Sequence, residues 1–180
     1  MRVDMSPQGI DVRLKRVSQL RDLCLSLSRS KPINSPNESC HMSVEENKAL
    51  VRRWVDAWNT DTIFETIDQI FTTDCIDRNS MLGGVRGIEG ARRLVRVFRS
   101  AFSNIQVKID LLISEGEWVA FRWIASAIHT GEFRNIAPTG KKVTITGITI
   151  HRVVDGKFAE GVTEIDCLGL LEQLGASPVS

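Results

Sequence analysis

The spacing of apolar residues changes once along the chain, near Ile105, and this change constrains the fold more than any other feature. Before that point apolar residues recur every three or four positions, which predicts amphipathic helices. Beyond it they alternate with polar residues over four segments, 106–114, 117–130, 142–153 and 157–165, a period typical of strands. Helices followed by a run of strands predict an α+β domain.

The connections between the predicted strands indicate antiparallel neighbours. Glu115-Gly116 and Asp155-Gly156 have the residues of tight hairpin turns, and 135–140 is a longer loop between the two longest strands. We therefore expect a curved antiparallel sheet, with the preceding helices on its concave face and a ligand pocket between them.

The helices have recognisable start signals. Ser43 and Glu46 form a capping-box pattern before the first helix, and Thr62 and Glu65 form another before the second. A third helix follows the turn-rich stretch 81–87 and directs five apolar residues inward: Ala91, Leu94, Val95, Phe98 and Phe102. Leucines over 168–174 predict a short terminal helix that packs onto the end of the sheet.

Four arginines lie on the other faces of the third predicted helix: Arg92, Arg93, Arg96 and Arg99. Such a cluster could bind phosphate. A solvated helix face is the interpretation we favour, because Glu89 can pair with Arg93 and no glycine-rich or aromatic partner accompanies the arginines.

Composition changes near residue 42. Residues 1–42 are rich in serine and basic residues and carry little core, so we interpret them as a disordered or weakly helical extension, with a helix over 12–27 left open. The predicted domain spans 43–176.

Bulk properties exclude several classes of partner. The formal charge of +1 provides no field that would attract nucleic acid or an acidic membrane. The four cysteines are widely spaced and form no CxxC pair, so they indicate neither a zinc site nor a disulfide framework. No apolar run approaches the ~18 residues that a membrane span needs, and no secretory signal is evident. We expect a cytoplasmic protein.

Alternation in the second predicted strand groups six residues on one face: Val119, Phe121, Trp123, Ala125, Ala127 and His129. Periodicity alone leaves open which face points inward. If this set does, His129 stands at the rim of an aromatic cavity and could exchange a proton near neutral pH. The alternative is an edge histidine bonded to a loop.

The last predicted strand ends at a carboxylate. Its parity aligns five residues: Phe158, Glu160, Val162, Glu164 and Asp166. Asp166 would then meet the pocket mouth, where aromatic neighbours raise the pKa of a carboxyl group and suit it to acid/base work. The alternative is a helix N-cap, since Asp166 directly precedes the leucine-rich segment.

Several stretches together resemble the SnoaL-like ester cyclases, a polyketide cyclase family related to nuclear transport factor two. The resemblance covers residues 43–175 and rests on six stretches in order: 51–59, 87–91, 129–133, 137–142, 152–157 and 166–175. It implies a cone-shaped, cystatin-like α+β barrel that dimerises through its sheet. It also implies an intramolecular aldol closure without metal or cofactor.

The resemblance further implies site residues. Asp166 matches the family's acid/base aspartate, His129 matches a histidine before Thr-Gly, and Asp77 matches a polar pocket position. Family members place His and Trp before that aspartate, where this chain has Gly161 and Val162.

We thus predict a cofactor-independent cyclase or isomerase acting on a hydrophobic, polyketide-like carbonyl compound, with Asp166 and His129 as catalytic residues. The predicted substrate-binding residues are Trp54, Trp58, Asp77, Phe102, Phe121 and Trp123. The rival hypothesis is a non-catalytic ligand-binding or dimerisation module of the same fold, which Gly161 and Val162 favour.

Overall fold

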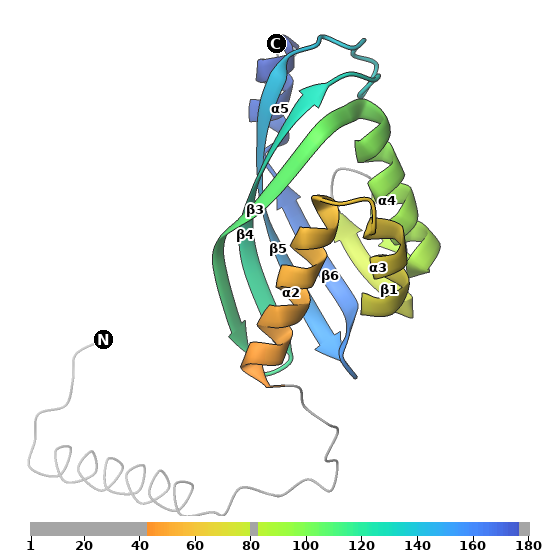
Figure 1. The fold of residues 1–180 in the computed structure, drawn as a ribbon, viewed down its shortest axis with the longest axis vertical. Coiled ribbons are helices and arrows are strands. Elements are labelled where there is room, and N and C mark those ends of the chain that lie inside the picture. The colour runs from red at the N-terminus through yellow and green to blue at the C-terminus, as the bar shows by residue number, and fades with distance from the viewer. Residues whose placement is uncertain (1–42, 80–82, 177–180) are drawn as a thin grey trace, which may run out of the picture. The chain divides into compact units, whose positions relative to one another are not determined.

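The computed structural model describes residues 43–79 and 83–176 (Figure 1). Their elements follow in the order α2 (Val44–Trp58), α3 (Ile63–Ile70), β1 (Phe71–Asn79), β2 (Val85–Arg86), α4 (Gly87–Ala101), β3 (Phe102–Glu115), β4 (Trp118–His129), β5 (Lys142–Val154), β6 (Lys157–Ile165) and α5 (Cys167–Leu174). The predicted extension over 1–42, with the helix over 12–27, lies outside the described residues.

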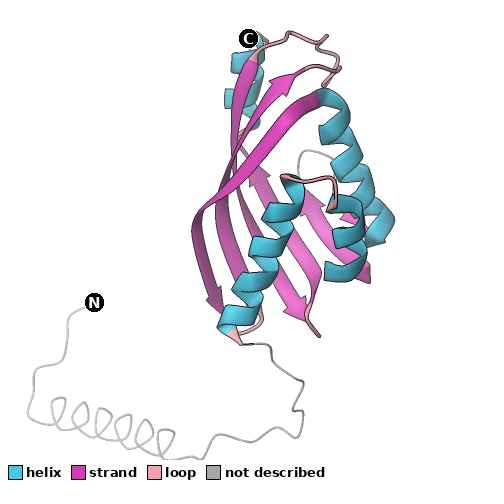
Figure 2. Cartoon of the chain, in the orientation of Figure 1, coloured by secondary structure: helices cyan, strands magenta, loops and turns pink. Residues whose placement is uncertain are grey.

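The sheet is mixed and open. Its six strands have the order β2-β1-β6-β5-β4-β3, and β3 to β6 form the antiparallel meander that the sequence predicts. The purely antiparallel expectation is wrong in one respect: β1 pairs in parallel with β6. Strands β2 and β3 are the two edges, so the sheet is strongly curved without closing into a barrel (Figure 2).

The helices α2, α3 and α4 lie on one side of this sheet (Figures 1 and 2). The core beneath them has two parts. The larger joins residues of α2, α3 and β1 to the inner face of β4 and β6, with Val51, Ile63, Ile67, Ile70 and Phe158 fully buried. The smaller surrounds Phe102 and includes Leu170 and Leu174 of α5.

The first capping box is confirmed. The Ser43 hydroxyl accepts from the Glu46 amide, and the Glu46 carboxylate accepts from the Ser43 amide. The second box is wrong, because Thr62 makes no side-chain cap bond; its hydroxyl bonds to that of Thr60 instead.

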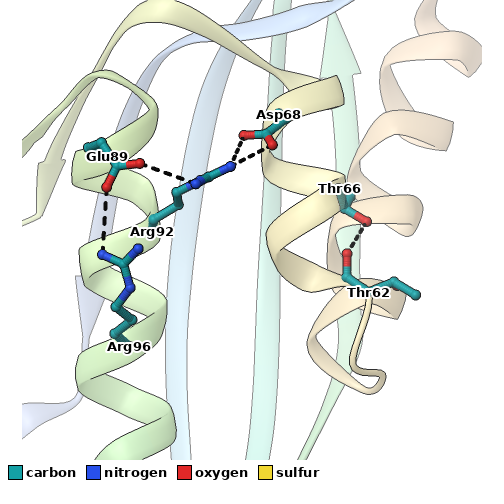
Figure 3. A network of polar contacts seen from close by, with 6 residues as sticks. All are labelled: Thr62, Thr66, Asp68, Glu89, Arg92 and Arg96. Atoms are coloured by element: carbon teal, nitrogen blue, oxygen red, sulfur yellow. Dashed lines mark hydrogen bonds and ion pairs between the residues drawn. The ribbon is translucent and has the colours of Figure 1, made fainter.

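Polar contacts join α3 to α4 on the outside of the domain (Figure 3). Arg92 donates two hydrogen bonds to the Asp68 carboxylate, and Glu89 pairs with both Arg92 and Arg96. The predicted pairing of Glu89 with Arg93 is therefore wrong. The cluster serves as a salt-bridged helix face, in line with the interpretation that we favoured over a phosphate site.

The structure shows which face of β4 points inward. Val119, Phe121, Ala125, Ala127 and His129 are buried, whereas Trp118 on the opposite face is exposed. The inner face of the sheet therefore carries the set that the sequence placed together around an aromatic cavity.

Candidate active site

A cavity of about 110 Å³ opens between the inner face of the sheet and the helices α2 and α4. One water needs only roughly 10–15 Å³ by the same measure, so the space suits an organic ligand. Most of the wall is aliphatic or aromatic. Its polar side chains are few: Asp77, Thr149, His151 and Thr163, with the indole of Trp123.

All six residues predicted to bind substrate line this cavity: Trp54, Trp58, Asp77, Phe102, Phe121 and Trp123. Trp54 and Trp58 meet edge to face with ring centroids 5.7 Å apart, and Trp54 also packs against Phe71. These aromatic contacts fix the helix side of the wall. That the six contact substrate stays a proposal.

Asp77 is the carboxylate that the cavity holds away from water. It stands on β1, and its Oδ1 atom is buried with no hydrogen-bond partner among the described residues. Burial raises the pKa of Asp77 to about 6, because the charged form loses solvation that no donor replaces. A carboxyl group in this state can take and return a proton near neutral pH.

His151 is the second polar group near this carboxylate, and sequence reasoning missed it. Its ring is stacked on Phe158 at 4.1 Å and lies close to Phe121. Burial lowers the pKa of His151 to about 4, and the hydrogen bond to the Glu160 carbonyl opposes this effect only in part. The imidazole is thus neutral at pH 7. Because a carbonyl only accepts, Nδ1 carries the proton of that 3.3 Å contact.

Gly161 separates Asp77 from His151. It pairs with Asp77 on β1 and with His151 on β5. A Cβ atom at this position would stand 2.7 Å from His151 Nδ1 and 3.2 Å from Asp77 Oδ1. The absence of a side chain at Gly161 therefore leaves both polar groups beside one open point of the wall.

A second polar strip lies further along the same face. The indole Nε1 of Trp123 donates to the Thr149 hydroxyl at 3.0 Å, and the hydroxyls of Thr149 and Thr163 lie 3.1 Å apart. The indole takes its place because Gly147, its partner on β5, has no side chain: a Cβ there would lie 2.4 Å from the ring.

His129 does not line the cavity. It is fully buried, and its Nδ1 accepts from the Thr139 amide at 3.2 Å and contacts the Thr139 hydroxyl at 3.1 Å. The loop-bonded alternative is therefore the one that the structure favours, and the predicted place at a cavity rim is wrong.

Asp166 is also outside the cavity. It is exposed and is the N-cap of α5, where its carboxylate accepts from the Gly169 amide at 2.8 Å. The predicted parity fails because the pairing of β5 with β6 shifts between Arg152 and Val153. Beyond this irregularity Gly161 and Thr163 face inward, and the strand ends with Asp166 turned to solvent.

Other candidate groups are less suited to chemistry. Cys75 lines the cavity, but burial, followed by the carboxylates of Asp77 and Asp74, raises the pKa of its thiol to about 11. Over residues 43–79 and 83–176, no three His, Cys, Asp or Glu side chains are grouped so that they could hold a metal ion. None of the helices described is long and apolar enough to cross a membrane.

An open, curved sheet with helices over a largely apolar cavity places the domain in the α+β class. A model of the SnoaL-like polyketide cyclase family matches residues 48–174. The chain therefore belongs to the SnoaL-like polyketide cyclase family.

Individual proteins of known sequence or structure are also similar to the chain. The chain is 30% identical over 131 residues to DnrD, the aklanonic acid methyl ester cyclase of Streptomyces peucetius, which covers 70% of this chain and 88% of DnrD. Among solved structures, AclR of Streptomyces galilaeus, named as a candidate hydroxylase, is 30% identical with a TM-score of 0.68 over 76% of this chain and 89% of its own. TsrD of Streptomyces laurentii is 27% identical with a TM-score of 0.68, over 76% and 99%.

Proposed function

We propose that this protein is a cofactor-independent cyclase or isomerase that closes a ring in a hydrophobic, polyketide-like carbonyl compound, with Asp77 as its acid/base. The observation that carries the proposal is the Asp77 carboxyl group: its Oδ1 atom is buried without a partner in a largely apolar cavity, and burial raises its pKa to about 6. The family and the named cyclase activity of DnrD support the reaction class.

The proposed reaction is an intramolecular aldol closure. The Asp77 carboxylate removes a proton from a carbon flanked by carbonyl groups, and the electron pair of that C–H bond enters the enolate. The enolate carbon attacks a second carbonyl carbon of the same molecule, forming one C–C bond. Protonated Asp77 then returns its proton to the alkoxide oxygen, so that substrate and product are isomers and no redox partner is needed.

His151 holds one side of the site in this proposal. Its ring is wedged among aromatic side chains and its Nδ1 proton is engaged by the Glu160 carbonyl, so it presents a fixed, neutral wall beside Asp77. A neutral neighbour does not stabilise the Asp77 anion by charge. The basicity of the carboxylate is preserved, as proton abstraction from carbon requires.

A non-catalytic binding module is the second candidate. The aspartate that the resemblance implied, Asp166, caps α5 at the surface, and this observation favours a pocket without the family's usual chemistry.

One pair of variants separates the two candidates. Aklanonic acid methyl ester, named in the relatives' activity, serves as the first substrate to be tested. We expect Asp77→Asn to lower kcat at least 100-fold, and Asp166→Asn, which keeps a capping oxygen, to turn over at the wild-type rate. Binding of the ester by wild type without turnover would support the module, and full activity of D77N would refute the acid/base assignment.

We also propose that the protein is a homodimer that uses the outer face of its sheet. One row of that face runs through Ile113, Ala120, Ile150 and Val162 across four strands, and three of these are exposed apolar residues. The flanking rows carry the ion pairs of Arg122 with Asp110 and Arg152 with Glu160. An apolar centre with a polar rim is the usual anatomy of a protein interface.

A further inference from the structure

Two threonine hydroxyls form the polar strip on the β5 and β6 part of the cavity wall. Thr149 and Thr163 retain only 5% and 7% of their exposure, and both line the cavity. The two hydroxyls are hydrogen-bonded to each other at 3.1 Å, and the Thr149 oxygen accepts from the Trp123 indole at 3.0 Å. The strip therefore links three neighbouring strands.

The strip has one hydroxyl proton that no oxygen of the strip accepts. The indole nitrogen only donates, so the Thr149 oxygen must accept from it. The two threonines have two hydroxyl protons, and one of them lies between the two oxygens whichever residue donates. The other proton is uncommitted within the strip. A buried hydroxyl without an acceptor is costly, so the strip is built to meet an acceptor that a ligand supplies.

The indole end of the strip is closely packed. Gly147 lets the Trp123 ring approach β5, because a Cβ atom at this position would come within 2.4 Å of the ring. Donation from the indole polarises the Thr149 hydroxyl and strengthens the next hydrogen bond in the chain. The Thr149 oxygen is thus held by the indole before any ligand arrives, and preorganised groups of this kind are what electrostatic stabilisation of developing charge requires.

The Thr149 and Thr163 pair lies on the inner face of the sheet, one row of paired residues away from the Asp77 carboxylate. Gly161 pairs with Asp77 and His151 in one row of the inner face, and Thr163, two residues further along β6, pairs with Thr149 in the next. Two residues of a strand span about 7 Å. This separation suits a group that presents a C–H to Asp77 at about 3 Å and a carbonyl oxygen to a hydroxyl at about 2.8 Å.

We propose that the Thr149 and Thr163 hydroxyl pair is a carbonyl-binding site: it donates a hydrogen bond to a ketone or ester oxygen of the ligand. Resting on the proposed function, the same donor holds the enolate oxygen that forms when Asp77 takes the neighbouring proton. The ligand class is an apolar compound with a carbonyl oxygen adjacent to an acidic C–H. A hydrocarbon of the same shape lacks the acceptor and binds less well.

A matched pair of probes tests the site without any turnover. 1-Tetralone and tetralin have the same bicyclic shape and differ in the ketone oxygen. By isothermal titration, we expect the wild-type chain to prefer the ketone by roughly 3- to 10-fold, the worth of one neutral hydrogen bond. The double variant Thr149→Val/Thr163→Val removes both hydroxyls and should abolish this preference.

The control is Thr66→Val. Thr66 is another buried threonine, and its hydroxyl donates to the carbonyl of Thr62, the N-cap of α3 (Figure 3). Thr66 is not among the residues that line the cavity. We expect T66V to keep the ketone preference unchanged. An unchanged preference in the double variant would overturn the carbonyl-binding site.

A second measurement does not depend on the folding of any variant. In a crystal structure of the wild-type chain with 1-tetralone, the ketone oxygen should lie within hydrogen-bond distance of Thr149 or Thr163 Oγ1. An oxygen placed against other groups would refute the site. Failure of the proposed function looks different: full turnover in D77N together with a retained ketone preference would leave the carbonyl site standing and remove only the acid/base role.

Discussion

The Nδ1 atom of His151 lies 2.7 Å from the point where a Cβ atom would stand at Gly161. This distance is shorter than any ordinary carbon–nitrogen contact, and the imidazole cannot move aside freely because Phe158 is stacked on it. We expect Gly161→Ala to lower the free energy of unfolding by roughly 1–3 kcal/mol, the usual cost of an added methyl group in a packed site. Urea unfolding followed by tryptophan fluorescence measures this change.

A double-mutant cycle identifies the partner in this clash. In a His151→Val background the ring is absent, so Gly161→Ala should cost clearly less than in the wild-type chain. Equal costs in the two backgrounds would mean that the imidazole does not limit the space at Gly161.

Asp77 makes the stability of the protein depend on pH. Its pKa rises from 3.8 to about 6 on folding, so the native state binds more protons than the unfolded chain between these values. Stability contributed by the protonated form is present below about pH 4 and is lost as the pH rises through 6. Asp77→Asn should therefore gain stability relative to wild type by on the order of 2 kcal/mol between pH 4 and pH 7. His151 titrates in both proteins, so its opposite contribution cancels in the difference. Thermal unfolding at the two pH values checks the sign, and a difference that does not change with pH would contradict the buried-anion account.

The pH dependence of turnover should also reflect the ionisation of Asp77. As the free base, Asp77 must be ionised, so kcat/KM is expected to rise with pH and level off above about pH 6. A rate that stays flat between pH 5 and pH 7.5, in the range where the protein is folded, would exclude Asp77 as the base.

The meander was predictable because its polarity alternates along the strands and its turns are marked by glycine. Strand β1 was not, since Phe71, Cys75 and Ile76 do not follow a period of two and the strand pairs with β6, far along the chain. Its parallel pairing is a tertiary contact that no local pattern records. The resemblance nevertheless singled out Asp77 on this strand as a pocket residue.

The polar site could not be predicted, because the usual burial of apolar residues and exposure of polar residues is inverted in β5. Ile148 and Ile150 are exposed, whereas Thr149 and His151 are buried and face the cavity. A rule that places apolar residues inside therefore assigns this stretch to the wrong face. The predicted place of Asp166 at the pocket mouth is wrong for a related reason. The register shift between β5 and β6 changes which side of the sheet the last residues of β6 face. Parity counted from Phe158 would be correct only for an unbroken strand.

Asp166 should matter for stability alone. Its carboxylate accepts from the Gly169 amide, so Asp166→Ala leaves a backbone donor of α5 without its partner. We expect a loss of about 1 kcal/mol in the free energy of unfolding and no change in the binding of 1-tetralone. Asp166→Asn keeps an oxygen in the capping position and should cost much less. If the alanine variant binds the probe more weakly than T66V does, Asp166 contributes to the pocket and its assignment as a cap is incomplete.

The outer face of the sheet should determine the oligomeric state. Ile113 is 58% exposed and Ile150 is 40% exposed, and both lie in one row that no helix of the described chain covers. Burying this row against a second copy would remove the apolar side chains from water, and charges at its centre would then be desolvated without partners. We therefore expect light scattering to give the mass of a dimer for the wild-type chain and of a monomer for Ile113→Glu/Ile150→Glu. Leu168→Glu is the matched control, because Leu168 is 54% exposed on α5 and lies outside the sheet, so this variant should remain dimeric. A monomeric wild type, or a double variant that stays dimeric, would show that the two copies do not meet through this row.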